Sequence, residues 1–187
     1  MRHVQAASAK TQIQVQTYSG LNRHAQAELR KMWLHATAAD THAIGWLPVA
    51  AFDGRADKNE ILSVENNGDC VGWCMSAVSD RRGILKLYQI WVRPDARILE
   101  HGRALISRLQ EQGRRAHCWQ IEAWVAEDLP ANLFWSAIGF ARNNWRWGRG
   151  AKPRKHWRWT TPTIKLCTEL PLSGKECDTQ SFQVTSN

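Results

Sequence analysis

The sequence predicts an α/β protein with a single domain over residues 1–163 and a loosely ordered tail over residues 164–187. Its 187 residues are enough for one sizeable core and too few for two ordinary domains. With 43% hydrophobic and 22% charged residues, the composition is that of a globular protein. Strand-like and helix-like periods alternate along the domain, whereas the chain beyond it is polar, rich in Ser and Thr and without periodicity.

The first predicted elements are a strand and a helix. Residues 12–18 alternate apolar and polar side chains, as a half-buried strand does. Asn22 can cap a helix in which apolar residues recur with the helical period. These residues are Leu29, Met32, Trp33 and Ala36. We expect residues 39–60 to be irregular, with room for one helical turn, and to supply a loop that covers the substrate.

A hairpin and a βαβ unit follow. Strand-like runs at residues 61–65 and 70–78 flank an Asn-Asn-Gly-Asp turn, whose residues tolerate positive φ angles. Residues 84–92 are strand-like on both faces, which indicates a central strand of a sheet. A helix over residues 101–112 and a strand over residues 118–125 complete a right-handed βαβ unit.

The last part of the domain is predicted to contain a short helix and a second hairpin. Asp128 can cap the helix, and Gly139 can end it. The hairpin strands are expected over residues 140–147 and 156–162. The loop between them is too rich in Gly, Pro and charge for regular structure.

Several classes of protein are disfavoured by the composition. No run approaches the roughly 18 apolar residues of a membrane helix, and the N-terminus has no signal-peptide core, so we expect a cytoplasmic protein. The five cysteines are odd in number and scattered, which argues against a disulfide framework. Cys70 and Cys74 would lie roughly 13 Å apart on one strand, too far to share an ion, and we expect no metal site.

The formal charge of +8 is unevenly distributed. No acidic residue lies between Asp128 and Glu169, a segment rich in Arg and Lys. An acidic partner, either a nucleotide cofactor or a nucleic acid, is therefore expected at this end of the molecule. Four tryptophans are interleaved with the cations, namely Trp145, Trp147, Trp157 and Trp159.

The turn VRPDARILEHGRAL, residues 92–105, has the form of a phosphate site. A helix N-terminus after a central strand offers unpaired N–H groups and a partial positive charge. This turn resembles the acyl-CoA-binding segment of the GNAT superfamily of N-acetyltransferases, where Val-x-Pro precedes Arg-x-x-Gly-x-Gly and a helix. The residues in register are Val92, Pro94, Arg97, Gly102, Ala104 and Leu105.

A second segment, residues 125–140, resembles the family's motif of Asn, Ala, an aromatic pair and a closing Gly-Phe. The matching residues are Ala131, Phe134, Gly139 and Phe140. Together with the order of the elements, the resemblance covers residues from about 12 to 162.

The resemblance implies a GNAT-like mixed, mostly antiparallel central sheet flanked by helices, with a splayed βαβ unit that binds acyl-CoA. It implies an enzyme that transfers an acetyl group from acetyl-CoA to an amine acceptor. It also implies which residues meet the cofactor through turn amides and strand polar groups. They are Ile90, Trp91, Val92, Arg97, Ile98, Leu99, Glu100, His101, Gly102 and Arg103.

The chain departs from the family pattern at three positions. Glu100 stands where the family has its first loop glycine. A carboxylate about 4 Å from a phosphate charge costs roughly 1 kcal/mol in water-like surroundings and about 4 kcal/mol at an effective dielectric of 20. Glu100 must therefore point away, or acyl-CoA binding is weakened. Trp135 replaces the tyrosine that often protonates the leaving thiolate in the family, and Asp128 replaces an asparagine.

Three residues are candidates for catalysis, each with a structural alternative. Tyr88 on the central strand can donate a proton or pack in the core. Glu122 can act as a base through water or be a satisfied polar residue of the sheet. Trp135 can stack on the substrate or belong to the core, because its indole has no proton to give at neutral pH. His101 is either catalytic or an exposed residue of the first helical turn.

The tryptophans of the second hairpin also have two interpretations. They can pack as cross-strand core partners, or they can form a surface for bases and phosphates together with the cations. In GNAT folds this neighbourhood often touches the acceptor, so its charge indicates an anionic one. The residues expected to meet acceptor or nucleic acid are Arg146, Arg149, Lys152, Arg154, Lys155 and Trp157.

Three functional hypotheses follow. The first is an acyl-CoA-dependent N-acetyltransferase. The second is a GNAT-like enzyme that modifies nucleic acid, since fold and charge give a weaker similarity to the Mom-type DNA modification proteins of phages. The third is a catalytically silent GNAT fold that serves as a binding module.

Overall fold

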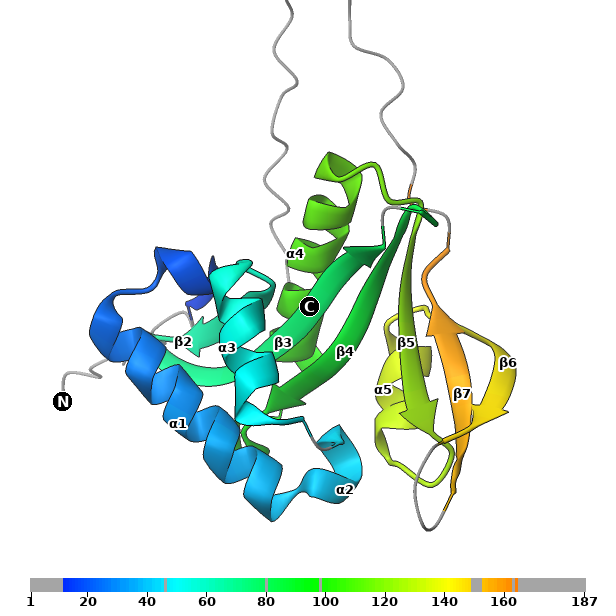
Figure 1. Cartoon of the computed structure of the whole chain (residues 1–187), viewed down its shortest axis with the longest axis horizontal. Coiled ribbons are helices and arrows are strands. Elements are labelled where there is room, and N and C mark those ends of the chain that lie inside the picture. The colour runs from blue at the N-terminus through cyan, green and yellow to red at the C-terminus, as the bar shows by residue number, and fades with distance from the viewer. Residues whose placement is uncertain are drawn as a thin grey trace, which may run out of the picture.

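The structure is a computed structural model of the chain and describes residues 12–45, 47–79, 81–97, 99–148, 153–162 and 164. A seven-stranded sheet in the order β1-β2-β3-β4-β5-β7-β6 forms its centre (Figure 1). Neighbouring strands are antiparallel except for β4 and β5, which are parallel. The predicted mixed, mostly antiparallel sheet flanked by helices is confirmed.

The elements follow one another in the predicted order. The strands are β1 (Ile13–Thr17), β2 (Ile61–Asn66), β3 (Asp69–Ser79), β4 (Ile84–Val92), β5 (Gln120–Ala126), β6 (Ala141–Trp147) and β7 (Lys155–Thr160). The α-helices are α1 (Arg23–Ala39), α2 (Thr41–Ile44), α3 (Val49–Asp57), α4 (Leu99–Arg115) and α5 (Ala131–Ala137). Two short 3-10 helices are η1 (Tyr18–Gly20) and η2 (Pro94–Ala96).

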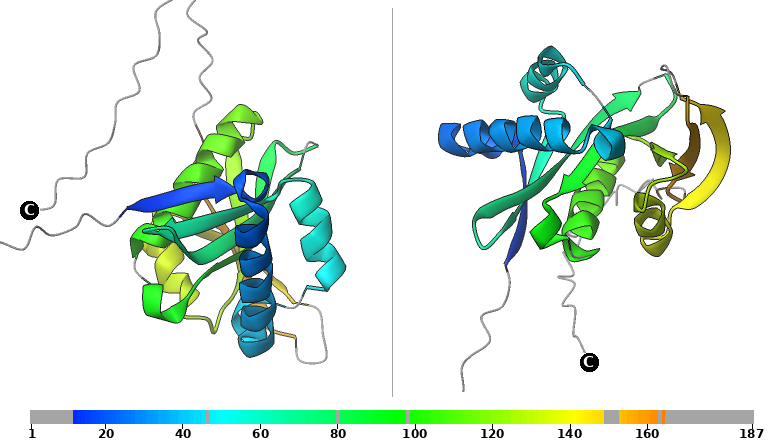
Figure 2. Two further views of the ribbon diagram at one scale, coloured as in Figure 1. Left: turned by 90° about the vertical axis from the view of Figure 1, so that its left-hand side faces the viewer. Right: turned by 90° about the horizontal axis from the view of Figure 1, so that it is seen from below.

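Helices cover both faces of the sheet, as the two views of Figure 2 show. On one face, α1 and α3 enclose a core that contains the fully buried Trp33 and Phe52, whose rings lie 4.8 Å apart. On the other face, α4 buries Leu105 and Leu109 completely in a second core. The sheet between the two cores is therefore interior on both faces over its middle strands, as predicted for residues 84–92.

Helix α1 begins as predicted, because the Asn22 side chain accepts a hydrogen bond from the Ala25 N–H at 2.9 Å. Its predicted apolar stripe faces the sheet, with Leu29, Trp33 and Ala36 buried. The Trp33 indole also donates a hydrogen bond of 3.1 Å to the Gln89 side chain of β4. This bond fixes α1 against the strand that forms one wall of the site described below.

The prediction that residues 39–60 are irregular is wrong for most of them, since they form α2 and α3. Helix α3 is held by one large anchor, Phe52, which also meets the Tyr18 ring edge-on at 6.0 Å. An ion pair of 3.0 Å between Arg30 and Asp53 ties α3 to α1. The remaining positions of α3 are small or polar, so the sequence shows no clear helical period.

The hairpin between β2 and β3 turns as predicted, with positive φ angles of 52° at Asn67 and 83° at Gly68. Ile164, the first residue of the predicted tail, is buried in the core beside α4. The rest of the predicted tail lies outside the described residues. No helix in the described part of the chain is long and apolar enough to cross a membrane.

The cysteines of β3 are packed in the protein. Burial raises the pKa of the Cys70 thiol to about 11 and raises the pKa of Cys74 further. The thiolate is the form that binds metals, so burial disfavours that role for both residues. Among the residues that the structure describes, no group of three His, Cys, Asp or Glu side chains is placed to hold a metal ion.

Candidate active site

The parallel strands β4 and β5 separate halfway along their length. They pair only over Ile84–Leu87 and Gln120–Ala123 and then diverge, as Figure 1 shows. The divergence begins at a bulge, because the register with β3 passes from Leu87 to Gln89 and leaves Tyr88 without a partner. A bulge bends the strand that contains it. Beyond Leu87, the β5-facing backbone of β4 therefore has no ladder partner and is available to a ligand.

A cavity of about 810 Å³ lies at the divergence. It is lined by residues of α2, β4, β5, α5, β6 and β7. Its volume falls in the range of about 300–1,000 Å³ that is usual for small-molecule sites. All three candidate catalytic residues line it, namely Tyr88, Glu122 and Trp135.

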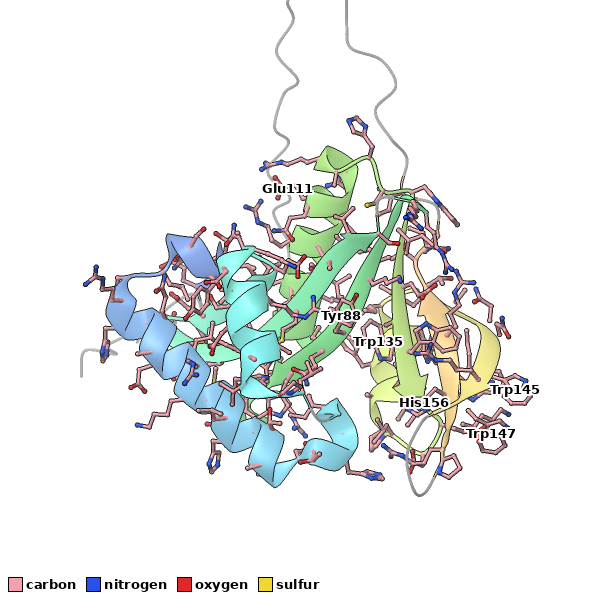
Figure 3. All side chains as sticks on the ribbon, in the orientation of Figure 1. Tyr88, Glu111, Trp135, Trp145, Trp147 and His156 are labelled. Carbon is pink, nitrogen blue, oxygen red and sulfur yellow. The ribbon has the colours of Figure 1, made fainter. Side chains whose placement is uncertain are left out.

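Tyr88 lies at the mouth of this cavity and is 45% exposed, so the alternative that it packs in the core is wrong. The guanidinium of Arg55, from α3, lies 3.8 Å from the centre of its ring. Tyr88, on β4, and Trp135, on α5, both line the cavity and are labelled in Figure 3. The phenol O–H of Tyr88 can donate a proton.

Glu122 is a satisfied polar residue. Its Oε1 accepts a hydrogen bond of 2.8 Å from the Trp124 indole, and its Oε2 accepts one of 2.7 Å from the Arg158 Nε. Only 8% of its side chain is exposed. Both oxygens of Glu122 are thus engaged. This arrangement positions Trp124 and Arg158 in the cavity wall, and it leaves Glu122 poorly placed to accept a proton from a substrate.

Trp135 belongs to the core and at the same time forms the floor of the cavity. It is 2% exposed and packs between Phe134 and Phe140, at ring distances of 5.1 and 4.9 Å. Its indole replaces a proton donor with an apolar surface. The predicted substrate-stacking role is limited to the part of the ring that lines the cavity.

The predicted cofactor segment runs from the end of β4 into α4. Ile90 packs against the α4 core, whereas Trp91 stacks on Trp73 at 4.7 Å in the core of the opposite face. The side chain of Trp91 therefore cannot meet a ligand in the divergence, although its backbone can. Arg97 is exposed, donates from Nε to the Val92 carbonyl at 3.0 Å and forms an ion pair of 3.6 Å with Asp40. Ile98 and the side chain of Leu99 lie outside the described residues.

The first turn of α4 contains one of the three departures from the family pattern, Glu100. Glu100 is exposed, so its carboxylate has room to point into solvent. The expectation that His101 is exposed is wrong, because only 1% of it is accessible. Its Nδ1 forms a hydrogen bond of 2.8 Å with the Ala96 carbonyl, and its Nε2 has no partner among the described residues. Arg103 is exposed on the same turn.

Gly102 is required for the contact between α4 and α5. A Cβ atom at this position would lie 2.5 Å from Cε2 and 2.8 Å from Cζ of Phe134. Such distances are far below ordinary carbon contacts of about 3.5–4.0 Å. The glycine that the sequence assigns to a pyrophosphate site is therefore also a packing residue in this chain.

The hairpin of β6 and β7 presents different tryptophans to the core and to solvent. Trp159 is buried and donates a hydrogen bond of 2.9 Å to Asn132. Trp145 and Trp147 are 47% and 60% exposed and project outward from β6 (Figure 3). The core interpretation is therefore confirmed for Trp159 and wrong for Trp145 and Trp147.

Cations lie over the outward tryptophans. Lys155 is 4.2 Å from the ring of Trp157 and 5.2 Å from that of Trp145, and Arg142 is 4.5 Å from Trp157. We call Arg142, Trp145, Trp147, Lys155 and Trp157 the tryptophan patch. Of the loop cations that the sequence singles out, Arg149 and Lys152 lie outside the described residues.

Arg146 points to the other face of β6 and into the cavity, where its guanidinium lies 4.0 Å from the ring of Trp124. Arg154 also lines the cavity and joins its two sides. It donates hydrogen bonds to the His42 carbonyl of α2 at 3.0 Å and to Asp128 at 3.2 Å. Desolvation alone would raise the pKa of Asp128, but the bond from Arg154 and nearby His42 hold it below its ordinary value.

The cavity residues that sequence reasoning missed include Lys86, Trp124 and Arg158. Trp124 could have been found, because it lies two residues after Glu122 and so shares its face of the strand. Lys86 and Arg158 depend on strand pairing, since they stand opposite Glu122 and Trp124 respectively in the sheet. Their placement requires the register of strands that are distant in the sequence.

Comparison with known proteins places this geometry in context. The model of the acetyltransferase (GNAT) family matches residues 21–140. A search of curated proteins by sequence finds no significant match.

Solved structures share the fold at low sequence identity. The ribosomal-protein-S18-alanine N-acetyltransferase of Escherichia coli is 14% identical, with a TM-score of 0.60 over 85% of this chain and 98% of that one. An N-acetyltransferase from Staphylococcus aureus Mu50 is 14% identical, with a TM-score of 0.65 over 82% and 99%. A Salmonella typhimurium protein solved with its cofactor acetyl-CoA is 16% identical, with a TM-score of 0.62 over 88% and 99%.

Proposed function

Because this chain belongs to the acetyltransferase (GNAT) family, we propose that it transfers an acetyl group from acetyl-CoA to an amine bound in the cavity between β4, β5 and β7. The family makes the chain an acetyltransferase, and acetyl-CoA is its acyl donor. The observation that carries the proposal is the divergence of β4 and β5, which leaves strand backbone groups unpaired beside a cavity of about 810 Å³.

The residues at the divergence fit a CoA ligand. The β5-facing backbone of residues 88–92 can accept and donate hydrogen bonds to an amide-containing arm. The first turn of α4 offers backbone N–H groups and the exposed Arg103 side chain to phosphates, with Arg97 close by. Bound there, acetyl-CoA supplies the thioester that makes acetyl transfer favourable. The exposed position of Glu100 is compatible with this assignment.

Tyr88 is the residue that we assign to proton transfer. It lies on the cavity wall, it is accessible, and its side chain ends in an O–H donor. Transfer of the acetyl group forms a C–N bond and breaks a C–S bond, and the departing sulfur needs a proton. Tyr88 can supply it, while the proton lost by the amine passes to water. Trp135 cannot take this role because its indole N–H is not acidic.

The proposal is tested by calorimetry with CoA and by an assay of CoA release with amine acceptors. We expect saturable CoA binding and about 100-fold lower kcat for Tyr88→Phe, at the lower end of the effect of a general acid. The affinity for CoA should not change. Tyr18→Phe is the matched control, because Tyr18 is the second of the two tyrosines and packs on α3, away from the cavity.

The outcomes separate the functional hypotheses. Absence of CoA binding at millimolar concentration would contradict the acetyltransferase proposal. CoA binding without transfer to any amine would favour the catalytically silent binding module. Normal kcat in Tyr88→Phe would leave acetyl transfer standing and remove Tyr88 from it.

A second candidate function is modification of nucleic acid, as in the Mom-type proteins of phages, with the strand bound at the tryptophan patch. The supporting observation is that Trp145 and Trp147 are 47% and 60% exposed, with Lys155 over the Trp145 ring and Arg142 over the neighbouring Trp157 ring. Stacking of a base on an aromatic side chain contributes about 1–3 kcal/mol. Fluorescence titration with single-stranded DNA at low salt should then show binding that Trp147→Ala weakens without lowering the melting temperature.

A further inference from the structure

We infer that the acceptor amine carries an anionic group, a carboxylate or a phosphate, which Lys86 and Arg146 bind in the cavity. This inference rests on the proposed acetyl transfer and specifies the class of acceptor. It is carried by three features of the cavity, namely its balance of charge, the fixed position of Arg146 and the opposed positions of the two cations.

The balance of charge in the cavity wall is positive. Glu122 is the one carboxylate among the described lining residues, and it is neutralised by its ion pair of 2.7 Å with Arg158. Arg154 is neutralised by Asp128 at 3.2 Å. Within the described residues, Lys86 and Arg146 form no ion pair, although both line the cavity. Arg82 also lines the cavity, and its sequence neighbour Asp80 lies outside the described residues.

Arg146 is held in place by Trp124 rather than by a carboxylate. Its guanidinium lies 4.0 Å from the indole ring, and the indole is fixed by its hydrogen bond of 2.8 Å to Glu122. A guanidinium that stacks on a ring keeps its N–H donors in the plane of the stack, where they can bind a carboxylate or phosphate in bidentate fashion. The chain thus orders the cation without using its hydrogen-bonding capacity.

Lys86 approaches from the other side of the divergence. It stands opposite Glu122 in the parallel register of β4 and β5, at the closed end of the opening. Lys86 is half-buried, whereas Arg146, from β6, is exposed. A half-buried cation without a counter-charge is unfavourable, so an anion beside it stabilises Lys86, and the N–H donors of the stacked Arg146 can bind the same anion. The positive charge of the cavity wall disfavours acceptors that carry additional positive charge.

The first test measures anion binding directly and does not depend on turnover. Indole N–H resonances are followed by NMR while inorganic phosphate or succinate is added at constant ionic strength. We expect a saturable shift of the Trp124 resonance, which is assigned by its absence in Trp124→Phe. The anion affinity obtained from this shift should be at least tenfold weaker in Lys86→Gln and in Arg146→Gln. Arg23→Gln on the exposed surface of α1 is the charge-matched control and should bind like the wild type. Absence of a saturable shift with both anions would overturn the inference.

The second test compares acceptors that differ only in charge. The pairs are β-alanine with β-alaninamide and phosphoethanolamine with ethanolamine, and putrescine represents cationic amines. We expect kcat/KM to be at least tenfold higher for the anionic member of one pair, which distinguishes carboxylate from phosphate. Lys86→Gln and Arg146→Gln should remove this preference while CoA affinity stays constant. Equal use of neutral and anionic amines by the wild-type protein would refute the anion site but leave acetyl transfer intact. Absence of CoA binding by the wild-type protein would refute the proposed function itself.

Discussion

The contact between Gly102 and Phe134 gives the sharpest prediction for the cofactor segment. A Cβ added at Gly102 would lie 2.5 Å from Phe134 Cε2, about 1 Å inside ordinary contact. Overpacking of this kind costs about 1–3 kcal/mol, and alanine in a helix recovers about 0.5–1 kcal/mol relative to glycine. Gly102→Ala should therefore lower the free energy of unfolding by up to about 2 kcal/mol.

The sign of the effect should reverse when the ring is removed. Leucine has no atoms equivalent to Cε2 and Cζ, so in a Phe134→Leu background only the helix propensity of alanine remains. Gly102→Ala should then stabilise by about 0.5–1 kcal/mol, which gives a coupling energy of about 1–3 kcal/mol between the two sites. Urea unfolding of the four proteins at neutral pH measures it. Equal effects in both backgrounds would refute the packing role, and a stable Gly102→Ala that loses CoA affinity would assign the glycine to the ligand alone.

Two further predictions concern the walls of the cavity, and a third concerns the first turn of α4. Arg158→Met leaves the Glu122 carboxylate buried without its partner and should cost about 2–4 kcal/mol of unfolding free energy, most of which the double variant with Glu122→Gln should recover. Gln89→Leu removes the hydrogen bonds to Trp33, Ile44 and Gly45 and should lower the free energy of unfolding by about 2–3 kcal/mol. It should also raise KM for the acceptor more than KM for acetyl-CoA. An unchanged acceptor KM would show that α2 does not shape the cavity. Glu100→Gly should tighten CoA binding or leave it unchanged, and a clear loss of affinity in calorimetry would assign Glu100 a positive role.

The parts of the fold that sequence reasoning predicted are those with a strong local signal. The stripe of α1, the hairpin at Asn67 and the apolar strand at residues 84–92 each follow from periodicity or turn chemistry. Helix α3 was missed because a single buried anchor, Phe52, holds it. One large side chain cannot produce a recognisable period, and the helix is stabilised by contacts with residues distant in the sequence.

His101 was misplaced although the sequence held the necessary signal. It precedes Leu105 by one helical repeat and Leu109 by two, so all three side chains lie on one face of α4. Both leucines and the histidine are buried. A polar residue type at the start of a helix suggested exposure, and the helical phase should have outweighed that suggestion.

The candidate site depends on a feature that no local pattern predicts. The bulge at Tyr88 arises where β3 and β4 fall out of register, and it places the side chain of the next residue, Gln89, toward α1 and α2. Gln89 then donates to the Ile44 and Gly45 carbonyls, which line the same cavity. One irregularity in the strand pairing thus both starts the separation of β4 from β5 and fixes the helix that closes the cavity on its other side. A sequence-based reading can find Tyr88 as a strand residue, but only the pairing shows why its ring faces the opening rather than the core.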